Sequence, residues 1–381
     1  GDNPVQMTTQ RSLTSTLAAQ IERVIQSKGG WIGFDAYMAL ALYTPGLGYY
    51  SNDLRKFGTM PAGVKGGGSD FVTAPEMTPL FGQTLAAQVA QALAVTRTRE
   101  VWEFGAGSGA LALQLLATAG DLVERYTIVD LSGTLRERQQ QTLAAHLDRV
   151  RWVSALPETM QGVVIGNEVL DAMPVKLLVR NGGVWHERGV GCEAGAAGEA
   201  ARFVWRDRST ALRPPVEIAG AHDYLTEIHP QAEAFVRTLA STLTCGAAFF
   251  IDYGFPEAEY YHPQRHMGTV MCHRAHRADA DPLAEVGEKD ITAHVNFTGL
   301  ALAAQETAPD VGTLGYTSQA RFLLNAGLAA KLEHATLAEK AMALRLINEH
   351  EMGELFKVIG FYKGEPWQAL GFAQGDRAPT L

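Results

Sequence analysis

From about residue 99 the sequence alternates short apolar strands with helices, and this order constrains the fold more than any other feature. A strand at 101–104 leads into the turn Glu103-Phe104-Gly105-Ala106-Gly107-Ser108-Gly109, and an Ala- and Leu-rich helix at 110–118 follows it. Strands alternating with helices are typical of a parallel sheet. We therefore predict an α/β fold with a mostly parallel sheet.

The same patterns divide the chain into four expected parts. They are an N-terminal helical and loop segment at 1–97, a core at 98–254 with a hairpin insertion near 178–208, an irregular lid or substrate rim at 255–310, and C-terminal helices with the last two core strands at 311–381. The further strands are expected at 126–129, 150–153, 162–166, 247–251, 356–362 and 367–372. Helices are expected at 12–27, 34–42, 78–95, 135–147, 230–243, 317–326 and 335–348.

Composition excludes several classes of protein. An apolar share of 46% over 381 residues argues against a disordered chain, and the absence of an apolar run of about 18 residues argues against a membrane span. With 32 basic and 41 acidic residues, a net charge of −9 argues against a nucleic-acid partner. Three cysteines without a CxxC pair exclude a disulfide framework and a four-cysteine zinc site, so we expect a reducing compartment, by default the cytoplasm.

The glycine turn predicts a ligand site. Gly105, Gly107 and Gly109 let the backbone approach a ligand, and the following helix offers amide donors. Asp130, at the end of the next strand, can accept both hydroxyls of an adenosine ribose, so the ligand is predicted to be a nucleoside derivative. Glu103 before alternate glycines favours S-adenosylmethionine, with this carboxylate near the methionine ammonium group. NAD and a simple turn without ligand remain alternatives, because the spacing also meets the relaxed dinucleotide pattern.

A second group of polar residues follows the strand at 162–166. Asn167, Glu168 and Asp171 stand where open α/β sheets bind ligands, and we place Asn167 on the cofactor side. Methyl transfer requires alignment of the acceptor, and two carboxylates can pair with a guanidinium and stabilise its charge. Glu168 and Asp171 are therefore the candidate catalytic residues. The alternative is that one caps the next helix while the other is solvated. Asp252, after the strand at 247–251, is a second-rank candidate or a structural cap.

The segment around 262–276 is rich in histidine. It contains His262, His266, His273 and His276, with Cys272 among them, but it lacks the paired ligands of a zinc signature. We therefore predict no metal. With its arginines, the segment is expected to form a lid or substrate rim, or else a solvated surface loop.

Several blocks outside the glycine turn resemble the MidA family of S-adenosylmethionine-dependent methyltransferases, which is related to a mitochondrial complex I assembly factor that methylates arginine. The blocks extend from about residue 20 to Val358. They are Phe34–Met38, Tyr43–Tyr50, Asp70–Gly82, Glu103–Gly109, Gly166–Val175, Asp290–Phe297 and Met352–Val358.

The resemblance implies a class I, Rossmann-like methyltransferase with a seven-stranded, mostly parallel sheet, an added N-terminal helical segment and insertions. It places S-adenosylmethionine at Gly105, Gly107, Gly109 and Asp130, and makes Pro75-Glu76 and Gly48-Tyr49-Tyr50 walls of the site. We expect a protein substrate. Because the mitochondrial members act on a respiratory-chain subunit, such a subunit is one candidate, and a second copy of the chain is a further candidate partner. Asn296 departs from the family pattern, which has Asp before Phe297.

We expect a methyltransferase acting on a protein side chain, most of all arginine. A non-catalytic assembly protein that keeps the fold is the alternative from another class, and an NAD-dependent dehydrogenase is a weaker one.

Overall fold

The computed structural model describes residues 4–52, 73–197, 202–274 and 277–381. The chain divides into two compact units built from interleaved segments. The hairpin unit comprises Gly1–Lys56, Ala172–Ala232 and Glu257–His294, and the sheet unit comprises Phe57–Asp171, Glu233–Pro256 and Val295–Leu381. Within the described ranges, no helix is both long enough and apolar enough to cross a bilayer.

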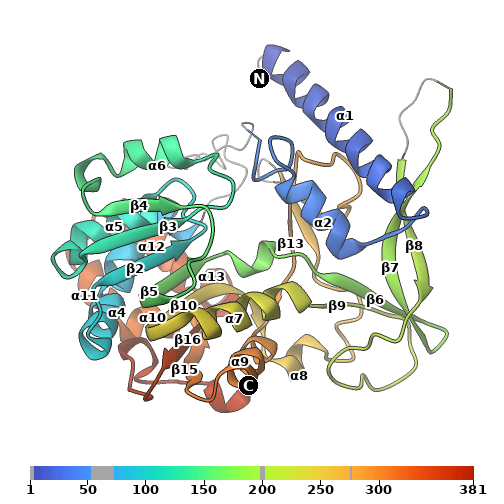
Figure 1. The fold of residues 1–381 in the computed structure, drawn as a ribbon. Coiled ribbons are helices and arrows are strands. Elements are labelled where there is room, and N and C mark those ends of the chain that lie inside the picture. Colours follow the sequence, from blue (N-terminus) through green and yellow to red (C-terminus); the bar gives the residue numbers. More distant parts are fainter. Residues whose placement is uncertain (1–3, 53–72, 198–201, 275–276) are drawn as a thin grey trace. The chain divides into compact units, whose positions relative to one another are not determined.

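The sheet unit is built on an eight-stranded sheet (Figure 1). Its main path runs β4, β3, β2, β5, β10, β16, β15, and β14 pairs with the end of β10. Only the pairs that β16 makes with β10 and β15 are antiparallel. The predicted mostly parallel α/β sheet is thus confirmed. Seven strands lie on the main path, and β14 is a short eighth strand beside it. The strands are β2 (Glu100–Phe104), β3 (Arg125–Val129), β4 (Val150–Val153), β5 (Met160–Asn167), β10 (Leu243–Phe255), β14 (Val295–Asn296), β15 (Val311–Ser318) and β16 (Phe356–Lys363).

Helices bury the central strands. Nearly every residue of β5 and β10 is buried, as expected for parallel strands that are covered on both faces. Helix α4 packs against both of these strands. The helices are α3 (Ala74–Met77), α4 (Leu80–Thr96), α5 (Ala110–Ala119), α6 (Arg136–Thr142), α7 (Pro230–Thr242, in this unit from Glu233), α9 (Phe297–Thr307), α10 (Gln319–Asn325), α11 (Leu328–Leu332), α12 (Leu337–Ile347) and α13 (Met352–Leu355), with 3-10 turns η1 (Gly120–Leu122), η2 (Ala144–His146), η3 (Leu170–Ala172), η4 (Leu370–Phe372) and η5 (Ala378–Thr380).

The strand predicted at 367–372 is wrong. This segment is irregular and ends in η4, while the missing edge strand is β15, whose last residues were expected to start a helix. Phe372 explains the error, because its ring covers the sheet where two glycines leave room. A Cβ built on Gly315 would lie 2.1 Å from Phe372 Cγ, and one on Gly360 would lie 2.7 Å from its Cε2. The apolar run therefore packs on the sheet and does not join it.

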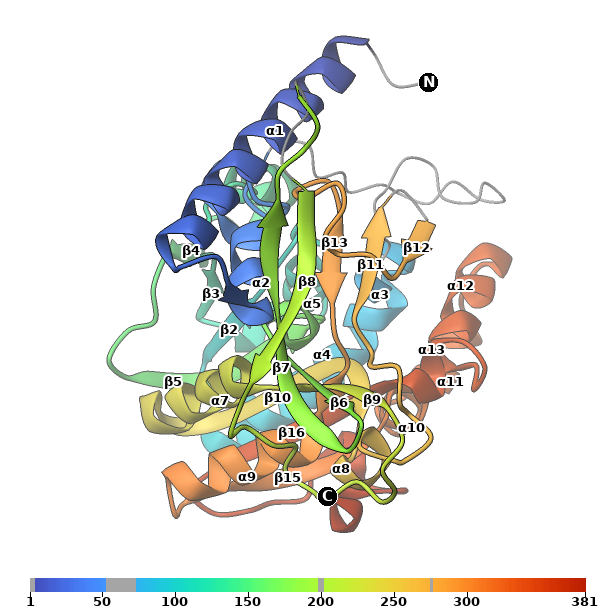
Figure 2. The same ribbon diagram turned by 90° about the vertical axis from the view of Figure 1, so that its right-hand side faces the viewer.

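The hairpin unit contains two small antiparallel sheets. The first has the order β1, β7, β6, β9 with β8 paired to β7, and the second has the order β12, β11, β13 (Figure 2). The segment expected to form a hairpin near 178–208 lies on β6, β7 and β8, and β6 and β7 meet at Gly182 and Gly183, whose φ angles of 56° and 79° suit a tight hairpin turn. The elements are α1 (Pro4–Ser27), β1 (Ile32–Gly33), α2 (Phe34–Tyr43), β6 (Lys176–Asn181), β7 (Val184–Glu193), β8 (Arg202–Ser209), β9 (Tyr224–Ile228), α8 (Glu257–Tyr260), β11 (Met271–Arg274), β12 (Arg277–Asp279) and β13 (Asp290–Thr292).

The expectation that 255–310 is irregular is also wrong, since its first part, up to Thr292, contains α8 and the strands β11, β12 and β13. These strands are three or four residues long, too short for a periodic apolar pattern to reveal them. Cys272 on β11 is fully buried in the core of the hairpin unit.

Candidate cofactor and acceptor site

The predicted strand, glycine turn and helix are present. β2 ends at Phe104 and α5 begins at Ala110. Between them Gly105, Gly107 and Gly109 have φ angles of 62°, 57° and 89°, in the left-handed region that favours glycine. The turn lies where the strand order reverses. On one side of β2 the sheet continues with β3 and β4, and on the other side it continues with β5 and β10. Ligands of open α/β sheets bind at such a reversal.

A close approach joins this turn to the segment after β5. A Cβ built on Gly105 would lie 2.8 Å from Val169 Cγ2, and one on Gly166 would lie 3.4 Å from the same atom. Any larger residue at position 105 would therefore displace Val169. This packing places Glu168, the neighbour of Val169, beside the glycine turn.

Two buried oxygen atoms near the strand ends fit a ligand that carries hydrogen-bond donors. Asp130 Oδ1 accepts bonds from Ser132 N (3.1 Å) and Ser132 Oγ (3.2 Å), while Asp130 Oδ2 is buried. Asn167, 8% exposed, ends β5 and also has a buried Oδ1. Within the described parts of the chain neither Asp130 Oδ2 nor Asn167 Oδ1 has a hydrogen-bond partner. Such acceptors fit the hydroxyl and amine groups of a nucleoside.

Glu103 is buried on β2, next to the turn. Burial raises its pKa to about 7, and the hydrogen bond that Tyr126 Oη donates to Glu103 Oε1 (2.6 Å) acts in the opposite direction. The carboxylate thus has one partner on the neighbouring strand β3. Its contact with a methionine ammonium group stays a prediction.

Two residues from other elements support the glycine turn by hydrogen bonds. The sequence did not single out the first, Gln139, and it placed the second, Glu76, only in a wall of the site. Gln139 on α6 is 2% exposed; its Nε2 donates to Gly107 O (2.8 Å), and its Oε1 accepts from Trp152 Nε1 (2.8 Å). Glu76 on α3 accepts a hydrogen bond from Ser108 Oγ, which brings the predicted Pro75-Glu76 wall to the turn. Gln139 is one of three consecutive glutamines, so no local signal in the sequence distinguishes it.

The candidate acceptor residues lie on a tight turn after β5. Glu168 has a φ of 55°, and its N–H donates to Ile251 O on β10 (2.8 Å). A left-handed conformation in a residue other than glycine costs on the order of 1–3 kcal/mol and is frequent at functional sites. Asp171 follows in η3 and is 6% exposed.

A third carboxylate joins this turn from β10. Asp252 is fully buried; its Oδ2 accepts from Leu170 N (2.9 Å) and Asp171 N (3.2 Å). Burial, and then the Glu168 carboxylate, raise the pKa of Asp252 well above its usual range. Burial, followed by the carboxylates of Glu168, Asp171 and Asp252, likewise raises the pKa of Tyr253. The side chains of Glu168, Asp171 and Asp252 therefore all influence Tyr253, and Asp252 is the residue that caps the turn after β5.

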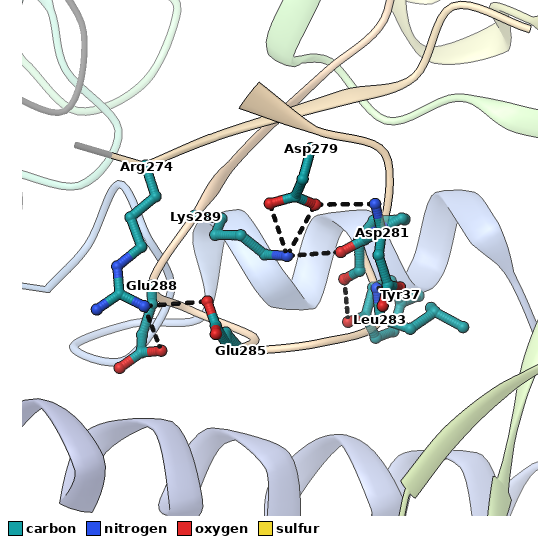
Figure 3. Close-up of polar contacts among 9 residues, drawn as sticks. Tyr37, Arg274, Asp279, Asp281, Leu283, Glu285, Glu288 and Lys289 are labelled. Atoms are coloured by element: carbon teal, nitrogen blue, oxygen red, sulfur yellow. Dashed lines mark hydrogen bonds and ion pairs between the residues drawn. The ribbon is translucent and has the colours of Figure 1, made fainter. Parts of the chain in front are cut away.

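The hairpin unit holds the second predicted wall and the histidine-rich segment. Tyr50 Oη donates to Asp290 Oδ1 (2.7 Å) within this unit. Arg274 pairs with Glu285 (3.0 Å) and Glu288 (3.2 Å), as Figure 3 shows. These ion pairs hold the segment in place around Arg274. His276 lies outside the described residues.

A buried lysine organises the next part of that segment. Lys289 Nζ binds Asp279 Oδ1 (3.2 Å) and donates to Asp281 O (2.6 Å) (Figure 3). Tyr37 on α2 donates to Pro282 O (2.6 Å). In the residues that the structure describes, no group of three or more His, Cys, Asp or Glu side chains is placed to hold a metal ion.

Asn296, which departs from the family pattern, caps α9: its Oδ1 accepts from Gly299 N (3.2 Å). Asn and Asp serve equally well as N-caps, so the cap tolerates the departure.

Comparison with known proteins assigns the fold and the glycine turn to one family. Residues 84–317, more than half of the chain and including β2, the glycine turn and Asp252, match the model of the family described as "Putative S-adenosyl-L-methionine-dependent methyltransferase". The chain belongs to this family. The predicted resemblance to S-adenosylmethionine-dependent methyltransferases is thus confirmed, and the family assignment favours this cofactor over NAD.

Solved structures of whole relatives support the family assignment. A candidate methyl transferase from Burkholderia thailandensis, bound to S-adenosyl-homocysteine, is 48% identical with a TM-score of 0.90, covering 100% of this chain and 99% of its own. An uncharacterised protein from the same species is 46% identical with a TM-score of 0.86, covering 100% and 99%.

More distant relatives carry a more specific description. The protein arginine methyltransferase NDUFAF7 of Danio rerio, a mitochondrial protein, is 26% identical and covers 86% of this chain and 82% of its own. NDUFAF7 of Homo sapiens is 26% identical and covers 90% and 81%.

Proposed function

We propose that this family member transfers a methyl group from S-adenosylmethionine to an arginine side chain of a protein. The observation that carries the proposal is a turn with three carboxylates: Glu168 and Asp171 lie on it, and Asp252 accepts hydrogen bonds from its backbone. This turn packs against the glycine turn through Val169. A guanidinium is the cationic group whose planar donors match paired carboxylates. The names of the distant relatives support the same acceptor.

The cofactor side is proposed to consist of the glycine turn, Asp130 and Asn167, with Glu103 near the methionine end. When bound, S-adenosylmethionine supplies a methyl carbon attached to a positively charged sulfur. The chain's own residues hold the acceptor nitrogen in line with that carbon and keep water away. In the transfer a nitrogen–carbon bond would form and the sulfur–carbon bond would break, which leaves the thioether S-adenosyl-homocysteine, and one guanidinium proton would pass to solvent. Glu168 and Asp171 stabilise the positive charge until that proton has left.

The test measures binding and transfer separately. Calorimetry with S-adenosyl-homocysteine reports the cofactor site. Incubation with methyl-labelled S-adenosylmethionine and a cell extract, followed by mass spectrometry, identifies the modified residue. We expect methylarginine, and we expect Glu168→Gln to bind S-adenosyl-homocysteine normally while transfer falls by about two orders of magnitude.

Three results would contradict parts of the proposal. Label on a residue other than arginine would refute the acceptor. Cofactor binding without any transfer would favour a non-catalytic assembly protein. Transfer by Glu168→Gln at the wild-type rate would remove Glu168 from the acceptor site.

A further inference from the structure

Asp252 stands out among the buried acidic residues because backbone donors surround its carboxylate. Besides the two bonds to Oδ2 from Leu170 and Asp171, Oδ1 accepts from Tyr253 N (2.9 Å). Three N–H groups therefore point at one side chain that is fully buried. A carboxylate that accepts several backbone N–H bonds is held in a single position.

The bonds reach the segment that carries the candidate acceptor residues. Leu170 and Asp171 are two and three positions after Glu168, whose left-handed backbone needs support from its surroundings. Glu168 N is itself bonded to Ile251 O, immediately before Asp252. β10 therefore fixes this turn at its first residue and again at its end.

Both oxygen atoms of Asp252 are used: Oδ1 accepts from Tyr253 N, and Oδ2 accepts from Leu170 N and Asp171 N. An Asn side chain has one acceptor oxygen, and its NH₂ group would face a backbone donor. The pair of acceptor oxygens is therefore what Asp supplies at this position and Asn does not.

We propose that Asp252 is the positioning residue of the acceptor site: it holds the turn of Glu168 and Asp171 in place. The identity of the acceptor in this inference rests on the proposed function, whereas the geometry of the turn does not.

The experiment compares Asp252→Asn with the wild type and with Asp376→Asn. Asp376 is a matched control in the same unit, because its Oδ1 also accepts two backbone bonds, from Tyr316 N (3.0 Å) and Ala378 N (2.9 Å). Four quantities are measured. They are the dissociation constant of S-adenosyl-homocysteine, the rate of methyl transfer to extract protein at saturating S-adenosylmethionine, the KM for S-adenosylmethionine, and amide hydrogen exchange over residues 168–172.

For Asp252→Asn we expect the saturated rate to fall at least tenfold, while the dissociation constant and the KM stay within twofold of wild type. Exchange over 168–172 should accelerate at least tenfold. Asp376→Asn should change none of these quantities more than twofold. If Asp252→Asn does not fold, Asp252→Glu, which keeps the charge but lengthens the side chain, is judged by the same measurements.

The inference is overturned if the saturated rate stays within twofold of wild type, or if cofactor affinity falls as much as the rate. If the wild type makes no methylarginine, the proposed function fails separately. The positioning of the turn is then decided by hydrogen exchange alone: accelerated exchange over 168–172 supports it, and unchanged exchange refutes it.

Discussion

Asp130→Asn tests the cofactor site because the two oxygen atoms of Asp130 have different surroundings. Oδ1 is used by Ser132, whereas Oδ2 is buried without a hydrogen-bond partner among the described residues. Asparagine keeps the first acceptor and replaces the second by an NH₂ group, which cannot accept from a ribose hydroxyl. A hydrogen bond to a charged group contributes about 1.5–3 kcal/mol. The dissociation constant of S-adenosyl-homocysteine should therefore rise about 10- to 150-fold.

The stability of the ligand-free protein should respond differently. The substitution removes a buried, uncompensated carboxylate oxygen, so the free energy of unfolding should stay within about 0.5 kcal/mol of wild type or increase. Calorimetry gives the affinity, and urea unfolding without ligand gives the stability.

Ser132→Ala serves as the matched control. It removes the hydroxyl that contacts Oδ1 and leaves Oδ2 unchanged, so affinity should stay within about twofold of wild type. If Asp130→Asn binds S-adenosyl-homocysteine as tightly as wild type, Asp130 does not contact the cofactor. Equal losses of affinity and stability would mean that Asp130 acts only on the fold.

Two further predictions concern the surroundings of the glycine turn. Burial raises the pKa of Glu103 to about 7, so the folded protein keeps a proton there that the unfolded chain loses above pH 4.5. The free energy of unfolding should therefore fall by roughly 3 kcal/mol as the pH rises from about 4.5 to about 7. Glu103→Gln should abolish this contribution. Identical unfolding curves of the wild type at pH 5 and pH 8 would contradict the prediction. Gln139→Leu leaves Gly107 O without its donor, so stability should fall by about 1–3 kcal/mol and affinity for S-adenosyl-homocysteine should also fall. Urea unfolding and calorimetry check both effects, and unchanged values would show that Gln139 does not support the turn.

Local patterns in the sequence predicted most of the central fold. The strand expected at 101–104 and the helix at 110–118 correspond to β2 and α5, and the turn between them requires positive φ angles at its glycines. The edge of the sheet was not predictable in the same way. A short apolar run such as 367–372 looks alike whether it joins a sheet or packs on one, and only the space at Gly315 and Gly360 decides.

The candidate site likewise contains some residues that the sequence could predict and others that it could not. Residues that are consecutive, such as Asn167 and Glu168, could be found from their place after a strand. Gln139 and the capping role of Asp252 could not, because their partners are 32 and about 80 positions away in the sequence. Contacts of this kind depend on which strands become neighbours, and strand order leaves no mark on local periodicity.

Val169 couples the glycine turn to the turn that carries Glu168 and Asp171. Its Cγ2 occupies the space that a side chain at Gly105 would need. A shift of the glycine turn must therefore move Val169 or open a void, and both are costly in a close-packed interior. Glu168 precedes Val169 directly, and Asp252 fixes the far end of the same segment. Under the proposed function, packing and backbone hydrogen bonds within one unit would set the separation between the methyl donor and the acceptor, and in-line transfer requires such precision.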